Sequence, residues 1–441
     1  MYGESYLEKF RFHLLLALTT GLVLSILFFW ISTSYYRIDV PSSLFAGGND
    51  GWCEVPNESI GVHCFGDFNE RIGLMAGDPQ KDLVETSPIG PLITIIGNFV
   101  ASVSSPRIAL VAALVIYIAC VLFPALVATR KASRADQLRA ALLLSLGTYP
   151  FIMVLDRGQS LAIAVPLMYL YLIGALKQDV RQVSIAVIAL ATIRPVFLGL
   201  SPLLLILGRP RRFLLTLIGG LLSPLTLLVV TGPGGTSRIT EWIDTSRQYA
   251  NSFREVNASL NPNASLSAVI YGITELLSVV PEPLQIDLRT SAVQISHVMA
   301  AIVASVITLG LVLVRRHVSA VLSAIALLAV FSLSFGKHVG PYYLVFALAV
   351  GALIFSDSTA ESPFLNRQPI TSSVLFAALV MTCSPTIIPL IPANWFELQL
   401  TGTLIQVRTL NIPLAVFFWF SFCISLLAGG FRSAFICYQK R

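Results

Sequence analysis

The sequence carries little charge for its length. Of its 441 residues, 12% are charged and 55% are hydrophobic, whereas soluble domains contain roughly 25% charged residues. The chain therefore lacks the charged side chains that would keep a molecule of this size in water. This composition excludes an ordinary soluble enzyme and predicts a protein that has lipid as its solvent.

Cysteine is also scarce, and familiar ligand motifs are missing. Six cysteines are too few for a disulfide scaffold, although Cys53 and Cys64 share one polar segment and would be able to pair in an oxidising compartment. No Gly-rich phosphate loop and no His, Cys, Asp or Glu set with metal-ligand spacing occurs. We therefore nominate no metal ligand and no cofactor, and dependence on a divalent metal stays open.

The net charge of +6 is spread over short segments between apolar runs. This distribution is typical of the positive-inside bias of membrane proteins, not of nucleic-acid binding. The first apolar run, 14–32, contains no charged residue and has the length of about 20 residues that a membrane-spanning helix needs. A cleaved signal peptide is the alternative, but the run is long for a signal core and no small-x-small cleavage site follows it.

Lys9 and Arg11 place the N-terminus inside, which puts the polar segment 34–90 outside. Residues 92–103 are too few to span and are interpreted as a re-entrant or interfacial helix on the outer face. Later basic clusters fit the same orientation. After the first helix, the predicted crossings are 108–129, 142–155, 161–176, 213–230, 293–314, 318–335, 341–355, 371–392 and 412–430.

Residues 182–208 have basic flanks at both ends and are interrupted at Arg194-Pro195. The basic flanks place both ends of this stretch on the same side of the membrane. The stretch is therefore predicted to be a broken hairpin with its tip at the Arg-Pro pair. Proline removes a backbone donor and arginine is costly in lipid, so such a break is tolerated where it is buried in protein or lines a wet cavity. We expect Arg194 to face a cavity.

These patterns predict an all-α polytopic membrane protein with about 10–12 transmembrane helices, forming one domain over residues 1–441. Both longer polar segments, 34–90 and 231–262, fall on the extracytoplasmic side, together with Lys337 and His338. The chemistry is therefore expected at the outer face of a plasma membrane, most simply the bacterial inner membrane. The inner segments are interpreted as connectors.

The most informative polar stretch is 65–91, with the sequence FGDFNERIGLMAGDPQKDLVETSPIGP. Asp67 opens a short predicted helix within it. Taken alone, an Asp at this place is as readily a helix cap, because its carboxylate accepts the orphan backbone N–H groups of the first turn. The residue gains significance from the motifs that follow it.

Several motifs occur in the order found in the lipid-linked-sugar mannosyltransferases of glycosyltransferase family 87, which this chain resembles. They are Asp67-Phe68, Ala76-Gly77-Asp78-Pro79, Pro88-Ile89-Gly90-Pro91-Leu92, Arg157-Gly158-Gln159-Ser160, Ile193-Arg194-Pro195, Asn261-Pro262-Asn263-Ala264-Ser265-Leu266, and His338 with Tyr342-Tyr343. Two departures are Asn69-Glu70-Arg71, where the family commonly has a Tyr, and Ser87-Pro88-Ile89-Gly90-Pro91, where it has Tyr-Pro-Pro. These departures most affect what the resemblance implies about the sugar and the acceptor.

The resemblance implies a GT-C-type fold that transfers a sugar from a polyprenyl phosphate to an acceptor hydroxyl. By its match, Asp67 is the general base. His338, Arg194 and Arg157 are the candidate groups for binding the donor phosphate. Alternatives are that His338 snorkels at the interface, that Arg157 pairs with Asp156, and that Arg194 binds carbonyls of the broken helix.

Gln159, Asn263 and Ser265 are candidates for binding the sugar or acceptor, although Asn and Ser are equally common as helix caps. The resemblance implies mannose or arabinofuranose as the donor sugar, and a glycolipid, polysaccharide or surface protein as the acceptor. A transporter or lipid flippase is the alternative function, because a broken hairpin with an intramembrane Arg also suits a substrate pathway. The absence of paired interrupted helices in the two halves of the sequence argues against transport.

Overall fold

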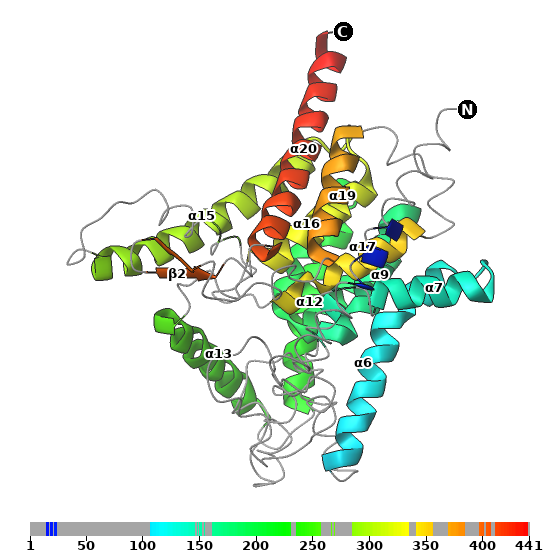
Figure 1. The fold of residues 1–441 in the computed structure, drawn as a ribbon. Helices are drawn as coiled ribbons and strands as arrows, with labels where there is room; N and C mark the ends of the chain where they lie inside the picture. Colours follow the sequence, from blue (N-terminus) through cyan, green and yellow to red (C-terminus); the bar gives the residue numbers. More distant parts are fainter. Residues whose placement is uncertain are drawn as a thin grey trace.

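The computed structural model describes residues 106–145, 161–230, 235–256, 285–334, 341–355, 369–383, 397–400, 403–406 and 411–439, with single positions between 15 and 23, between 148 and 154, and at 266 and 269. Nearly all of the described residues are helical (Figure 1). The predicted outer segment 34–90 and the predicted re-entrant helix 92–103 lie outside the described residues.

The described elements are helices and one pair of short strands. In order they are α6 (Pro106–Ala128), α7 (Arg134–Ser145), α9 (Leu161–Lys177), α10 (Val180–Ile193), η1 (Pro195–Leu200), α11 (Leu203–Ile206), α12 (Pro210–Val230), α13 (Ser237–Val256), α15 (Gln285–Leu313), α16 (Ala320–Leu333), η3 (Pro341–Val345), α17 (Phe346–Phe355), α19 (Pro369–Cys383), β1 (Glu397–Leu400), β2 (Thr403–Gln406) and α20 (Asn411–Gln439).

Three of the described helices are long and apolar enough to cross a membrane. Their apolar stretches are Val111–Ala128, Pro210–Val230 and Leu414–Gln439. Other described helices are equally apolar but shorter, such as Ala320–Leu333. The described part is thus that of an α-helical membrane protein, while the number of crossings and their orientation stay predictions.

Two helices at the centre of the molecule, α16 and α17, are buried on almost every side (Figure 1). Twelve of the fourteen residues of α16 are buried, and so are nine of the ten residues of α17. They pack against α6, α9, α19, α20 and η1. A helix that is apolar on all faces is typical of a protein core or a membrane span, and here other helices cover most of the surface.

The outer helix α15 has apolar residues on both of its faces. One stripe is buried, with Ala300, Ala304, Ile307 and Leu311 at most 2% exposed. The opposite stripe, which consists of Ile302, Val306, Leu309 and Leu313, is 55–67% exposed. Water would penalise so much exposed apolar surface, whereas lipid tails would not.

A hydrogen-bonded tryptophan joins α19 and α20 inside the core. The indole N–H of Trp419 donates to the hydroxyl of Thr382 at 2.8 Å, and that hydroxyl donates to the carbonyl of Ala378 at 2.7 Å. The Trp419 ring also packs against the ring of Phe346 on α17, with their centroids 4.7 Å apart. The buried indole therefore has the polar partner that it needs.

Two described elements differ from the simple pattern of apolar crossings and polar loops. Most of the predicted outer loop 231–262 is helix α13, on which Ile239, Trp242 and Ile243 recur at helical spacing among polar residues. The second is a small antiparallel hairpin that lies between α19 and α20 in the sequence, with Leu400 of β1 opposite Thr403 of β2. The all-α prediction contains no such hairpin, whose two strands are four residues each.

Candidate functional site

The helix between Val180 and Arg194 breaks where the sequence predicts. Arg194 has an extended backbone, with φ −149° and ψ 122°, because the ring of Pro195 disfavours helical geometry at the residue before it. The Arg194 N–H still donates to the Leu190 carbonyl at 2.9 Å, and its own carbonyl accepts from the Phe197 N–H at 3.1 Å. Both backbone polar groups of Arg194 are thus satisfied.

Beyond the break, η1 and α11 return the chain to its starting level. Val180 and Gly208, at the two ends of this segment, line the same pocket. The predicted broken hairpin is therefore confirmed in its break and in its return. We call the segment around Arg194 the tip of the hairpin and the end at Val180 and Gly208 its base.

The tip is held by close packing of η1. A Cβ atom added to Gly199 would lie 2.0 Å from the ring of Phe331 on α16. On the other side, a Cβ atom added to Gly220 of α12 would lie 2.2 Å from the side chain of Leu198. The hydroxyl of Tyr171 on α9 donates to the Leu200 carbonyl at 3.2 Å. Three helices therefore fix the position of η1.

The side chain of Arg194 contacts Tyr343 on η3. Its guanidinium donates a hydrogen bond to the Tyr343 hydroxyl, and its Cζ atom lies 4.9 Å from the centroid of the Tyr343 ring. Arg194 is half-buried and Tyr343 is 9% exposed. A tyrosine stabilises the cation through its ring quadrupole and its oxygen without adding a negative charge. The guanidinium thus keeps its full formal charge in this contact.

This contact joins two of the motif segments that are 149 residues apart in sequence. One is Ile193-Arg194-Pro195, and the other is the late His/Tyr segment, in which Tyr343 follows His338 by five residues. The sequence contains both motifs but does not pair them, because no periodicity relates residues so distant. The remaining site predictions lie outside the described residues, namely Asp67, Arg157, Gln159, Asn263, Ser265, His338, Cys53 and Cys64.

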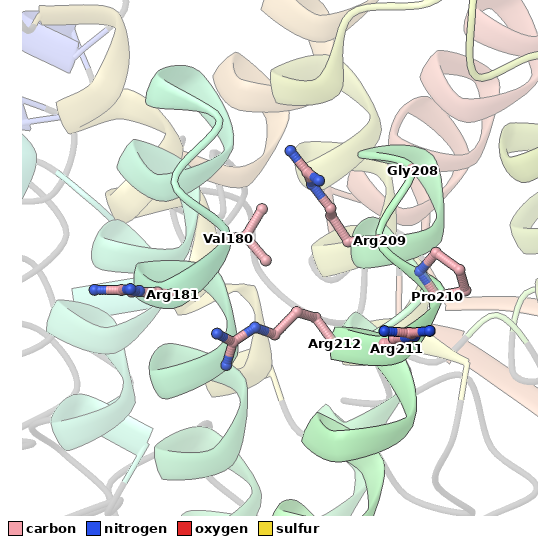
Figure 2. A pocket seen from close by; sticks show the side chains of 7 residues that line it. All are labelled: Val180, Arg181, Gly208, Arg209, Pro210, Arg211 and Arg212. Carbon is pink, nitrogen blue, oxygen red and sulfur yellow. The ribbon is translucent and has the colours of Figure 1, made fainter.

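The base of the hairpin is a basic pocket of about 570 Å³. Its lining residues are Val180, Arg181, Gly208, Arg209, Pro210, Arg211 and Arg212. Figure 2 shows that Arg209 and Arg212 extend into the gap between the starts of α10 and α12, while Arg181 and Arg211 lie at its edges. From the sequence, these arginines are interpreted as topological signals in connectors, and no pocket is predicted there.

Two similar turns build this base. After α9, the N–H groups of Gln178 and Asp179 donate to the carbonyls of Ala175 and Gly174, and Gln178 adopts φ 55°. After α11, the N–H groups of Gly208 and Arg209 donate to Leu205 and Leu204, and Gly208 adopts φ 73°. Both are Schellman caps, which end one helix in a left-handed residue and allow the next to begin at once.

Arg315, which follows α15, reaches the same end of the fold. Its guanidinium donates to the Leu205 carbonyl at 3.2 Å. The basic residues after α15 and those at the start of α12 therefore lie at one end, as the positive-inside pattern requires of segments predicted on the same side. Among the residues that the structure describes, no group of three potential metal ligands occurs, and Cys120, Cys383, Cys423 and Cys437 are free thiols.

The described fold and site define a helical membrane protein with one arginine at a helix break and a basic pocket at the other end of the same hairpin. The sequence matches no protein-family model, no curated protein and no solved structure. The resemblance to the lipid-linked-sugar mannosyltransferases therefore depends on the ordered motifs, and any function derived from it is a proposal.

Proposed function

We propose that the protein is a membrane glycosyltransferase that moves a sugar, mannose or arabinofuranose, from a polyprenyl-phosphate donor to an acceptor hydroxyl at the extracytoplasmic face. The observation that carries this proposal is the contact between Arg194 and Tyr343. It brings together two segments whose order in the sequence resembles that of family 87, and it does so at a break in a membrane helix.

An arginine at such a position calls for a functional reason, because a charged side chain inside apolar helices is costly. Ile193 and Phe197, close to Arg194 in the sequence, and Val345, two residues after Tyr343, are fully buried and apolar. In surroundings of low polarity, a fixed cation attracts an anion more strongly than it would in water. The phosphate of a lipid-linked sugar is an anion delivered from the membrane, so Arg194 suits it as a partner.

The proposed reaction needs one proton acceptor and one site for a departing phosphate. The acceptor hydroxyl gives its proton to the Asp67 carboxylate while its oxygen bonds to the anomeric carbon. The bond from that carbon to the phosphate oxygen breaks, and its electron pair leaves with the polyprenyl phosphate. Arg194, with His338 and Arg157, stabilises the negative charge that develops on this phosphate. Gln159, Asn263 and Ser265 would bind the sugar or the acceptor.

The decisive experiment measures transfer of radiolabelled sugar from polyprenyl-phosphate mannose or arabinofuranose in membranes that contain the full chain. Asp67→Asn removes the proton acceptor but keeps the shape of the side chain, so we expect transfer to fall by roughly 10²- to 10⁴-fold. Asp50→Asn, a change in the same predicted polar segment, is the matched control and should transfer normally.

Undiminished transfer by Asp67→Asn would remove Asp67 from the role of base. No transfer from either donor by the unmodified chain would contradict the proposed function. In that case, movement of labelled lipid across proteoliposome membranes would test the transporter or flippase alternative.

A further inference from the structure

The basic pocket at the hairpin base is separate from the proposed catalytic face. α10 runs for fourteen residues between the pocket at Val180 and the break at Arg194, which is about 21 Å of helix. The pocket therefore has no part in the sugar transfer proposed above. Its chemistry has to be explained independently of that proposal.

Four exposed arginines, Arg181, Arg209, Arg211 and Arg212, surround this pocket. Within the described part of the chain, no carboxylate lies within ion-pairing distance of their guanidinium groups. Asp179 precedes the pocket in sequence, but its carboxylate accepts the N–H groups of Arg181 and Gln182 at 2.9 and 3.1 Å as the cap of α10. The pocket is thus strongly positive and suits an anion with several oxygen atoms.

The start of α12 adds to this preference. Pro210 is the first residue of α12 and has no N–H to offer. The next N–H groups, of Arg211 and Arg212, belong to the first turn, where an α-helix provides no carbonyl partner. The positive end of the helix dipole is therefore directed at the same pocket that the arginines surround.

The apolar surface beside the pocket identifies the kind of anion. Arg211 begins an exposed stripe on α12 that continues at helical spacing through Leu214, Leu215, Ile218 and Leu222, each more than half exposed. The opposite face, which includes Thr216, Gly220 and Leu228, is buried in the fold. Because Arg211 lines the pocket and also begins this stripe, a phosphate group bound at the Arg211 edge of the pocket would lie at one end of a surface suited to acyl chains.

We propose that this pocket binds the phosphate headgroup of an anionic phospholipid, with the acyl chains lying along the exposed stripe of α12. A volume of about 570 Å³ is within the usual range of roughly 300–1,000 Å³ for small-ligand sites. Basic pockets between transmembrane helices at the cytoplasmic face are a general site for such headgroups. Charge and apolar surface together favour a lipid over soluble phosphate, which would gain nothing from the stripe.

The test places a tryptophan reporter in the stripe, Ile218→Trp, in the full chain reconstituted into phosphatidylcholine vesicles. Dibrominated phosphatidylglycerol replaces part of the phosphatidylcholine, and quenching of the added fluorescence reports lipid binding beside the pocket. We expect dibrominated phosphatidylglycerol to quench the fluorescence of the added tryptophan at a lower mole fraction than dibrominated phosphatidylcholine does. Arg209→Gln with Arg212→Gln in the reporter chain should weaken this preference by roughly tenfold or more.

The matched control is Arg134→Gln with Arg139→Gln, which removes the same charge from exposed positions on α7. It should keep the preference for phosphatidylglycerol. If the variant with both Arg209→Gln and Arg212→Gln does not fold, Arg212→Gln alone replaces it in the test. This single variant should lose part of the preference for phosphatidylglycerol. The proposal is overturned by equal quenching from the two brominated lipids, by an equal loss in the α7 control, or by excess inorganic phosphate that abolishes the preference at constant ionic strength.

Discussion

The tip and the base of the α10–η1–α11 hairpin both present arginine, but in contrasting surroundings. At the tip, half-buried Arg194 is oriented by the ring and hydroxyl of Tyr343. At the base, four exposed arginines surround an open pocket. A single oriented cation can stabilise one charge at one position, whereas a cluster offers general affinity for an anionic group. We therefore expect single changes to act strongly at the tip and weakly at the base.

The largest effect is expected from Arg194→Gln. Loss of the cation should lower kcat/KM for sugar transfer by about 100-fold, as removal of one group that stabilises transition-state charge commonly does. Arg194→Lys should recover part of the loss, since it keeps the charge but not the planar guanidinium. Arg139→Gln is the control, because Arg139 is exposed and pairs with Asp136 at 3.3 Å. Unchanged transfer by Arg194→Gln would contradict the distinction between tip and base.

Gly199→Ala should give the next largest effect, this time on stability. The new methyl group would collide with the ring of Phe331, and such overpacking costs about 1–3 kcal/mol in the free energy of unfolding. Equilibrium unfolding in mixed micelles measures the change. Gly219→Ala is the control, because its Cβ would meet only the flexible end of Ile188 at 3.0 Å. Equal stability of the two variants would show that η1 is not tightly packed.

At the base, Gly208→Ala should destabilise for a different reason. No atom lies within 4 Å of an added Cβ there, but the φ of 73° costs an L-residue roughly 1–2 kcal/mol. Gly208→Asn should cost less, because Asn tolerates this conformation better. The same unfolding assay separates the two variants. If Ala and Asn are equivalent, the positive φ of this position does not determine the cost.

Tyr171→Phe should have the smallest effect of the four. It removes the hydrogen bond to the Leu200 carbonyl and leaves the buried ring in place. Side-chain hydrogen bonds between membrane helices average about 0.6 kcal/mol, so the free energy of unfolding should fall by about that amount. A loss greater than that of Gly199→Ala would mean that Tyr171, and not the packing of η1, holds the tip.

The sequence was sufficient to predict the break at Arg194-Pro195, because proline acts on the backbone of its immediate neighbour. It was also sufficient for most long apolar helices, such as α6 and α12, whose length and composition are local properties. Helix α13 was interpreted as a loop because its residues are mainly polar. Its apolar positions, beginning with Ile239, give a periodic signal that was present but not used.

Other features are not local and could not be predicted in this way. The pairing of Arg194 with Tyr343 depends on how η3 packs against the hairpin, and a single sequence contains no measure of that. The pocket at the base depends on the return of α11 to the level of Val180, which places Arg181 and Arg209 in the lining of one pocket. The arginines were recognised as charges, but a shared cavity is a property of the three-dimensional arrangement.

The burial of α16 has a consequence for the order in which the protein is built. α16 lies within the predicted crossing 318–335. α20 packs against it but follows it in the sequence, so a crossing at α16 would enter the bilayer before that cover exists. Fourteen residues form a helix of about 21 Å, which is shorter than the hydrocarbon thickness of about 30 Å. Alone, α16 would have to thin the bilayer around it. Once the later helices surround α16, its length no longer has to match the bilayer, and we expect its depth to be set by these neighbours and not by the lipid.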